Sequence, residues 1–408
     1  MNPQGRSASR APRIVHVVFN RVHLLPPLLH ELAWMRAQDF DLHLVAPAYD
    51  QRTADVARML PHVHAVWLPV ALRRLSAHPH PLLKLLRYME FLMRAARVLA
   101  GLRADVIVGH DVTVMPAVLV ARWVRHAAVV YHAHELWSEA SEDNAPLRSL
   151  WRRVERWVVR SADRVVAPEP HRAVILHEEY GARQLPVLVR NVPPATEDAP
   201  RSDGATLHAL LGLAVDAQVV VYQGLVAASR CLEEAADALA LLPAQVHLVV
   251  IGGGEERTRA RLAAHATHAA GRLHLVPHVE RAALAPLTAS AQVGLLLYRN
   301  DGRNNYYAAP NKLYEYLFAG LPVVASDFPG LHAIVVEGGF GACADPVDAR
   351  AIASAIGKAL QVADAGAALA ARARGSFRYE DDVVHLRDAY VDLARGRCGQ
   401  NAESEHPS

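Results

Sequence analysis

The sequence has few cysteines and no long apolar run. Its 408 residues include three cysteines, Cys231, Cys343 and Cys398, which lie far apart and form no CxxC spacing. This argues against a disulfide framework and fits a reducing compartment. No stretch of eighteen uninterrupted apolar residues exists, so no membrane-spanning helix is predicted. Residues 1–12 are polar and basic and lack the apolar run of a signal peptide, so we expect a cytoplasmic protein.

Lysine is also scarce, and charge is unevenly distributed. Three lysines, Lys84, Lys312 and Lys358, stand against forty arginines. Residues 1–193 carry 25 basic and 17 acidic side chains, whereas residues 194–408 carry 18 basic and 24 acidic ones. The first half is therefore suited to approach an anionic ligand or surface. No nucleic-acid motif is visible, and aromatic-interleaved basic clusters on a β-sheet platform are absent, so nucleic acid is not an expected partner.

Short apolar strands alternate with helical patterns along the chain. In the first half the predicted strands are Arg13–Phe19, Asp41–Ala46, Val63–Leu68, Asp105–Gly109, Ala127–Tyr131, Arg164–Ala167 and Val187–Arg190. In the second half they are Val219–Tyr222, Val246–Ile251, Leu273–Leu275, Val293–Leu297, Val323–Ala325 and Ala342–Ala344. This alternation predicts an α/β fold with two doubly wound, Rossmann-like domains that face a cleft.

The predicted domain boundary is a run rich in Pro, Asp, Ser and Gly from residue 191 to residue 204. We expect an N-terminal domain over 12–193 and a second domain over 205–370. A helix is predicted over about 377–395, and residues 396–408 are expected to form a disordered tail.

Residues 310–326 are the most informative stretch. They read as a loop, a short helix with Asn311 as N-cap, a Gly-Leu-Pro turn and a buried strand. Lys312 and Glu315 stand in the first turn, where packing does not explain them. A helix N-terminus attracts anions, a lysine beside it suits a phosphate, and a carboxylate one turn on can accept bonds from sugar hydroxyls. The alternative is a surface ion pair.

A second candidate anion site runs from Gly224 to Arg230, after the first strand of the second domain. A phosphate would meet helix N–H groups here, and the Arg230 guanidinium can bind a diphosphate bidentately. The alternative is a solvated arginine before the acidic pair Glu233 and Glu234. The triple glycine at 252–254 is a weaker signal that is more typical of a tight turn.

The order and spacing of several segments resemble the family 4 glycosyltransferases of the GT-B fold. The segments are Tyr222–Gly224 with Arg230 and Leu232-Glu233, Leu248–Gly254, Pro310–Ser326, Val189–Pro193, and, on the acceptor side, Asp105–Asp111 and Val129–Glu139. The resemblance implies a retaining enzyme that moves a sugar from a nucleotide-diphosphate sugar to a carbohydrate or lipid-linked acceptor. It also implies a role in polysaccharide or glycolipid biosynthesis, and a last helix that packs back on the first domain.

In the second domain the resemblance implies a donor site. Its residues would be Gly224, Arg230, Asn311 and Lys312 for the diphosphate, Glu315 for the ribose, and Tyr307, Ala308 and Ala309 for the donor-sugar loop. The family's Glu-x7-Glu pair is incomplete, because Tyr307 stands where its first glutamate is expected. The missing contact would then come from Asp301, Asn304 or Asn305.

On the acceptor side the resemblance implies Asn20, Arg21, Asp111 and Glu135. His134 matches a histidine that lies beside the reacting sugar in relatives, and it is the candidate catalytic residue; the alternative is a structural role. His132 and His134 face one side of a strand, but no third ligand at metal spacing is recognisable. We expect no metal and no cofactor besides the nucleotide-sugar co-substrate, because Arg230 and Lys312 can neutralise the leaving diphosphate.

The stretch Leu72–Arg103 combines seven basic side chains with Glu90 as its single acidic one. A basic amphipathic helix of this kind can contact an anionic membrane, here the inner face of the cytoplasmic membrane. The alternative is a helix packed on the sheet with a solvated basic face. Two other functions remain open: a sugar-nucleotide epimerase of the same fold, and a non-catalytic nucleotide-sugar-binding subunit, which the departure at Tyr307 motivates.

Overall fold

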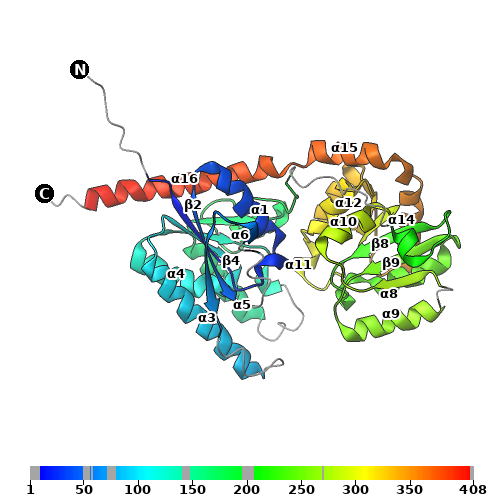
Figure 1. The fold of residues 1–408 in the computed structure, drawn as a ribbon, viewed down its shortest axis with the longest axis horizontal. Helices are drawn as coiled ribbons and strands as arrows, with labels where there is room; N and C mark the ends of the chain where they lie inside the picture. The colour runs from blue at the N-terminus through cyan, green and yellow to red at the C-terminus, as the bar shows by residue number, and fades with distance from the viewer. Residues whose placement is uncertain are drawn as a thin grey trace, which may run out of the picture. The chain divides into compact units, whose positions relative to one another are not determined.

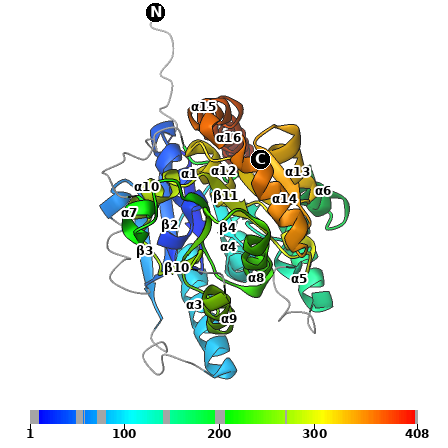
Figure 2. The same ribbon diagram turned by 90° about the vertical axis from the view of Figure 1, so that its right-hand side faces the viewer.

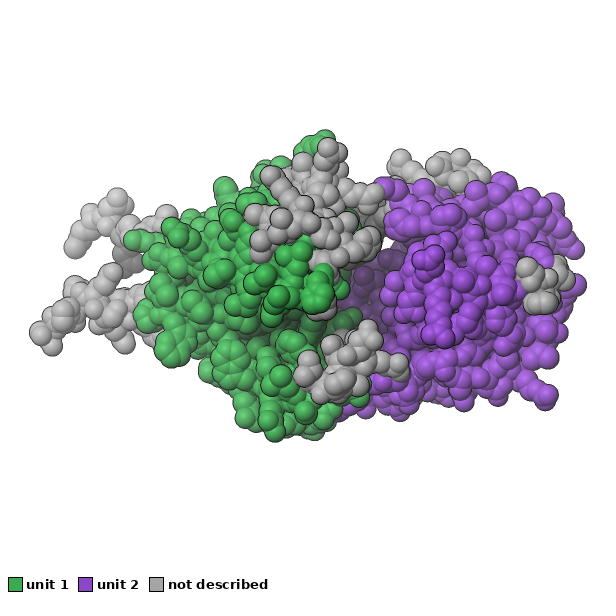
Figure 3. Space-filling view, turned by 90° about the horizontal axis from the view of Figure 1, so that it is seen from below, with its two compact units in different colours: residues 1–138, 143–189, 380–408 green, residues 139–142, 190–379 purple. Residues whose placement is uncertain are grey.

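A computed structural model describes residues 10–48, 56, 58–70, 80–139, 148–194, 206–268 and 271–404. The chain divides into two compact units (Figure 3). Unit 1 comprises residues 1–138, 143–189 and 380–408, and unit 2 comprises residues 139–142 and 190–379. Most of the predicted linker, from residue 195 onward, lies outside the described residues.

Unit 1 is built on a seven-stranded parallel sheet. Its strands are β1 (Arg13–Val17), β2 (Asp41–Ala48), β3 (His64–Pro69), β4 (Val106–His110), β5 (Ala128–His132), β6 (Arg164–Ala167) and β7 (Val187–Leu188). Their order is β3-β2-β1-β4-β5-β6-β7, and all neighbouring pairs are parallel. The chain winds outward from β1 and then from β4, which places the switch point of the topology between these two strands.

The sheet of unit 1 is accompanied by helices α1 (Pro26–Met35), α3 (Pro81–Gly101), α4 (Met115–Arg125), α5 (Arg148–Ser161), α6 (Pro170–Glu178) and α16 (Tyr379–Ser404). Helices α3 and α4 pack side by side (Figure 1). Helix α16 joins unit 1, where the Tyr390 hydroxyl donates a hydrogen bond of 2.6 Å to Glu31 Oε1. It continues to Ser404, past the predicted end near residue 395.

Unit 2 is built on a six-stranded parallel sheet. Its strands are β8 (Gln218–Gln223), β9 (Val246–Ile251), β10 (Leu273–Val276), β11 (Val293–Leu296), β12 (Val323–Ser326) and β13 (Gly341–Ala344). Their order is β10-β9-β8-β11-β12-β13, again with parallel neighbours. The switch point lies between β8 and β11, so a ligand of unit 2 is expected beyond the carboxyl end of β8.

The helices of unit 2 are α7 (Leu207–Leu211), α8 (Leu232–Ala238), α9 (Glu256–His268), α10 (Arg281–Ala289), α11 (Arg303–Tyr306), α12 (Asn311–Phe318), α13 (Pro329–His332), α14 (Ala349–Leu360) and α15 (Gly366–Ser376). Helix α8 packs beside α9, and α12 packs against α15 (Figure 2).

The predicted α/β fold class is confirmed, since both units contain a doubly wound parallel sheet. Each predicted strand overlaps an observed strand, and the ends differ by no more than two residues. Among the described helices, none has the length and the apolar character needed to cross a membrane.

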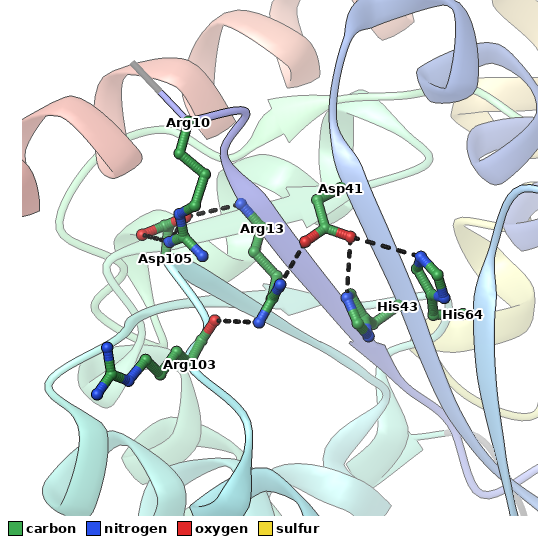
Figure 4. A network of polar contacts seen from close by, with 7 residues as sticks. All are labelled: Arg10, Arg13, Asp41, His43, His64, Arg103 and Asp105. Atoms are coloured by element: carbon green, nitrogen blue, oxygen red, sulfur yellow. Dashed lines mark hydrogen bonds and ion pairs between the residues drawn. The ribbon is translucent and has the colours of Figure 1, made fainter. Parts of the chain in front are cut away.

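A polar network joins the amino ends of strands β1 to β4 (Figure 4). Arg13 Nε donates to Asp41 Oδ2 at 2.6 Å, and the Arg13 backbone N–H donates to Asp105 Oδ2 at 2.7 Å. Burial acts to raise the pKa of Asp41, but the hydrogen bond from Arg13 and the nearby positive charges outweigh it and lower that pKa. Because ligands of these sheets bind at the opposite, carboxyl ends, we assign this network a structural role.

Candidate active site

In unit 2 the loop after β8 packs directly against the loop after β9. Gly224 has a φ of +129° and Gly252 a φ of +147°. A Cβ atom at Gly252 would lie 2.0 Å from the carbonyl oxygen of Gly224, and one at Gly254 would lie 2.0 Å from that of Val226. Only glycine permits both these backbone angles and this close approach. The triple glycine therefore shapes the loop that carries Gly224.

Two cations lie beside this loop, next to Tyr222. The Nζ atom of Lys312 is 4.2 Å from the centre of the Tyr222 ring. The Cζ atom of Arg230 lies 4.3 Å from the centre of the Tyr298 ring, and burial raises the pKa of Tyr222 although the Arg230 charge acts against it. A Cβ atom on Gly224 would be 3.0 Å from Lys312 Nζ. The structure thus brings together Gly224, Arg230 and Lys312, which the sequence predicted at one diphosphate.

The two cations repel each other. Desolvation and then the charge of Arg230 lower the pKa of Lys312 to about 7, whereas Glu315 acts in the opposite direction. An anion placed between the two side chains would stabilise the protonated lysine and raise its pKa again. The pair is therefore arranged to bind a negatively charged group.

Helix α12 presents Lys312 at its N-terminus. It begins at Asn311, with Pro310 as N-cap and no hydrogen bond from a capping side chain. The prediction of Asn311 as N-cap is wrong, because the extended backbone of Pro310 takes that position and Asn311 becomes the first helical residue. The first N–H groups of a helix have no partner within it, so this end can bind an anion.

Glu315 is held one turn further along the helix. Gln223 Nε2 donates a hydrogen bond of 2.5 Å to Glu315 Oε2, and the Thr288 hydroxyl donates to Gln223 Oε1 at 2.5 Å. Leu313 and Leu317 are buried and anchor the helix on the sheet. The carboxylate is thus fixed near the end of β8, on the same helix as Lys312.

The loop before α12 contains Tyr307, Ala308 and Ala309. Arg230 Nη1 donates to Asn305 Oδ1 at 3.3 Å, and Asn305 Nδ2 donates to Asp301 Oδ1 at 2.7 Å. Of the alternatives to the missing glutamate, Asn305 and Asp301 therefore lie beside Arg230. The Ala309 carbonyl accepts a hydrogen bond of 2.7 Å from Asn191 Nδ2. Sequence reasoning missed Asn191, since the contact joins residues far apart in the chain.

In unit 1 the predicted acceptor residues follow the carboxyl ends of β1, β4 and β5. Asn20 and Arg21 are exposed after β1, and Glu135 is exposed after β5. Asp111 follows β4 with a φ of +64°, and its Oδ1 accepts a hydrogen bond of 3.2 Å from the backbone N–H of His134. Burial, and then the Glu135 charge, raise the pKa of Asp111 to about 8. The carboxyl of Asp111 is therefore largely protonated at neutral pH.

His134 belongs to a cluster of four histidines, which also includes His16, His110 and His132. His110 lies between two others, with Nε2 3.1 Å from His16 Nδ1 and Nδ1 2.9 Å from His134 Nε2. The rings of His132 and His134 stack with centroids 4.3 Å apart. Burial is the main cause that lowers the pKa of His110 and of His134 well below the ordinary value. The sequence signal for this cluster was a histidine at the end of two strands that pair, β4 and β5.

Comparison with solved structures places these two units in a known class of fold. Sucrose-phosphate synthase from Thermosynechococcus elongatus matches with a TM-score of 0.75 at 19% identity, over 94% of this chain and all of that one. HepE from Anabaena, solved in complex with UDP-glucose, matches with a TM-score of 0.70 at 16% identity, over 93% of this chain and 99% of the other. The protein therefore has the GT-B fold.

The sequence comparisons identify the family. Residues 28–193 match the glycosyl transferase 4-like domain, and residues 217–362 match the glycosyl transferases group 1. The chain therefore belongs to the glycosyltransferase family that these two models describe, the group 1 glycosyltransferases with a family 4-like N-terminal domain. A D-inositol 3-phosphate glycosyltransferase from Xylanimonas cellulosilytica is 30% identical over 258 residues, which cover 60% of this chain and 60% of that relative.

Proposed function

We propose that the protein is a retaining glycosyltransferase that moves a sugar from a nucleotide-diphosphate sugar to a carbohydrate or lipid-linked acceptor. The observation that carries this proposal is the grouping of Arg230 and Lys312 around Tyr222, next to the Gly224 loop. In this proposal unit 2 binds the donor and unit 1 binds the acceptor. Uridine diphosphate sugars are the first donors to test, because the similar HepE structure contains UDP-glucose.

The chemistry follows from where negative charge develops. As the bond between the sugar and the diphosphate breaks, charge accumulates on the leaving phosphate oxygens. Arg230, Lys312 and the N-terminus of α12 would stabilise that charge from fixed positions. These protein groups supply the positive charge, so departure of the diphosphate requires no metal in this proposal. His134 would orient the acceptor or the reacting sugar.

A turnover assay tests the proposal and separates it from its two rivals. The full chain is incubated with a panel of nucleotide sugars, and both nucleoside diphosphate release and donor identity are measured. We expect slow hydrolysis without acceptor and transfer with a suitable one. An isomerised donor would instead indicate a sugar-nucleotide epimerase, and binding without turnover would indicate a non-catalytic subunit.

The low pKa of Lys312 leads to a pH-dependent binding prediction. At pH 8 a lysine with a pKa of about 7 is mostly neutral, and a bound diphosphate should raise that pKa. We therefore expect UDP binding at pH 8 to take up close to one proton, and its affinity to increase as the pH falls from 9 towards 7. Titration calorimetry in two buffers of different ionisation enthalpy measures the uptake. The Lys312→Arg variant, whose side chain stays charged, should bind UDP without proton uptake. Equal proton uptake in the native protein and the variant would contradict the assignment of this proton to Lys312.

Glu315 should contribute to binding of the nucleoside part of the donor. If its carboxylate binds the ribose hydroxyls, Glu315→Ala should weaken the binding of UDP and of uridine by a similar factor. That factor is about 10-fold for a lost charge-assisted hydrogen bond. Lys312→Ala should weaken the binding of UDP and leave the binding of uridine almost unchanged. Competition titrations with both ligands compare the two variants, and a Glu315→Ala effect confined to UDP would reject the ribose role.

A membrane contact is also part of the proposal. Helix α3 leaves a stripe of apolar side chains exposed, 44–64% each, formed by Leu82, Leu85, Leu86, Met89 and Met93. Lys84, Arg87, Arg94 and Arg97 lie on the same helix. An apolar stripe flanked by basic residues suits the surface of an anionic bilayer. The part of the predicted basic stretch before residue 80 lies outside the described residues.

We expect the protein to float with phosphatidylglycerol vesicles and much less with phosphatidylcholine vesicles. Replacing Leu85 and Met89 with aspartate should reduce the partition coefficient about 10-fold or more, because two apolar contacts are lost and negative charge is added. The matched control is Leu241→Asp, which changes a leucine of similar exposure (55%) in unit 2. Equal binding to both kinds of vesicle would contradict a docking role for α3. So would a decrease in the partition coefficient of Leu241→Asp as large as that of the α3 variant.

A further inference from the structure

The histidine cluster of unit 1 has the composition of a metal site. His110 ends β4, His132 ends β5, and His134 follows two residues later. Because side chains alternate along a strand, His132 and His134 point the same way, and His110 is the direct neighbour of His132 across the sheet. One suitable nitrogen from each histidine lies within 4.8 Å of the others. In a tetrahedral zinc site with bonds of about 2.1 Å, ligand atoms are about 3.4 Å apart, so small ring rotations close this arrangement on a cation.

A second observation points to a missing partner at the same place. Glu31 reaches the cluster from α1, and its Oε2 atom lies 3.4 Å from His132 Nδ1. These two buried atoms form an ion pair with each other, whereas the buried His16 Nε2 has no hydrogen-bond partner. Buried polar atoms normally have partners, because an unpaired one costs about 1–3 kcal/mol. A carboxylate that pairs with one ring nitrogen of a histidine is also the usual neighbour of a metal-bound histidine, so the contact between Glu31 and His132 fits a metal site.

The surroundings hold the ligands in the way a metal site requires. Glu31 is held by the hydrogen bond from the Tyr390 hydroxyl, and the backbone N–H of His134 donates a hydrogen bond to Asp111. His110 and His132 are almost completely buried, at 1% and 3% exposure. Imidazoles with a carboxylate beside them are typical ligands of Zn²⁺ and related divalent cations.

We propose that His110, His132 and His134 bind a divalent transition-metal cation such as Zn²⁺, with the Glu31 carboxylate as its neighbour. Three protein ligands leave a coordination position that an oxygen atom can take. The site belongs to unit 1 and is separate from the diphosphate-binding cations of unit 2. It shares His134 with the proposed acceptor region, but metal binding can be measured without nucleotide or acceptor, so its test is separate from that of sugar transfer.

The test uses the untagged full chain and requires no nucleotide. The protein is freed of metal with a chelator, and Zn²⁺ is titrated in competition with a chromophoric chelator. We expect about one Zn²⁺ per chain, a higher melting temperature with Zn²⁺, and the visible absorption of four-coordinate Co²⁺ when Co²⁺ replaces it. His110→Ala should reduce Zn²⁺ affinity at least 100-fold, and Glu31→Gln about 10-fold.

A second histidine pair provides the matched control. His247 and His274 stack in unit 2, with ring nitrogens 3.0 Å apart. His274→Ala should leave Zn²⁺ affinity and stoichiometry unchanged. If His110→Ala fails to fold, His132→Gln, which keeps a polar side chain of similar size, replaces it. Absence of stoichiometric binding in the native protein would overturn the proposal, and so would an affinity that is the same in the native protein, the cluster variants and His274→Ala.

Discussion

Replacing Lys312 with alanine is expected to lower kcat/KM for sugar transfer by about 10²–10³-fold. Lys312 lies within 4.2 Å of the Tyr222 ring centre, on the side of the Gly224 loop, where the leaving diphosphate is proposed to bind. Removing one preorganised group that stabilises developing charge typically costs this factor. Steady-state kinetics with the best donor from the panel measure the effect, and most of it should be in kcat.

The chain offers a matched control for this variant. Lys358 is the other lysine of unit 2 and lies exposed on α14. Lys358→Ala should leave kcat/KM within about 2-fold of the native value, since an exposed charge away from the site contributes little. If the two alanine variants show the same kinetics, Lys312 does not act on the diphosphate. Lys312→Arg should recover part of the activity, because the positive charge remains.

Gly252→Ala is expected to have the second large effect, on stability and donor binding together. Its φ of +147° is unfavourable for alanine, and its Cβ would lie 2.0 Å from the backbone oxygen of Gly224. Neither loop can yield without displacing the other, so we expect a loss of about 3–4 kcal/mol in the free energy of unfolding. Nucleoside diphosphate affinity should fall as well, because the Gly224 loop moves. Urea unfolding and ligand titration measure the two effects.

The adjacent glycine distinguishes this explanation from a general sensitivity of the turn. A Cβ atom at Gly253 would meet nothing within 4 Å. Gly253→Ala should therefore change the unfolding free energy by less than about 1 kcal/mol and leave ligand affinity almost unaltered. A large loss in Gly253→Ala, or native stability in Gly252→Ala, would show that the contact between the two loops does not determine the site.

Much of the fold could be predicted, because its signal is local. Continuous apolar runs such as Arg13–Phe19, separated by helical patterns, indicate parallel strands buried on both faces. That Gly224, Arg230 and Lys312 lie close together could be predicted for a related reason. Gly224 follows directly on β8, Arg230 lies two residues before α8, and Lys312 is the second residue of α12; at such positions the topology determines what meets a ligand.

The parts that the sequence did not reveal depend on contacts between distant residues. Tyr390 hydrogen-bonds Glu31 across 359 positions of chain, and Asn191 binds the carbonyl of Ala309. The third imidazole, His110, becomes a neighbour of His132 only when β4 and β5 pair in register. Local pattern carries no information on such pairings. The error at Asn311 has another origin, since proline can take the N-cap position without a capping side chain.

The most direct test of the central claim is a crystal structure of the protein with a bound nucleoside diphosphate, chosen as the one that raises the melting temperature most. We expect diphosphate oxygens within hydrogen-bonding distance of the Arg230 guanidinium, the Lys312 ammonium and the Gly224 loop. A diphosphate bound elsewhere, with neither Arg230 nor Lys312 in contact with it, would contradict the account.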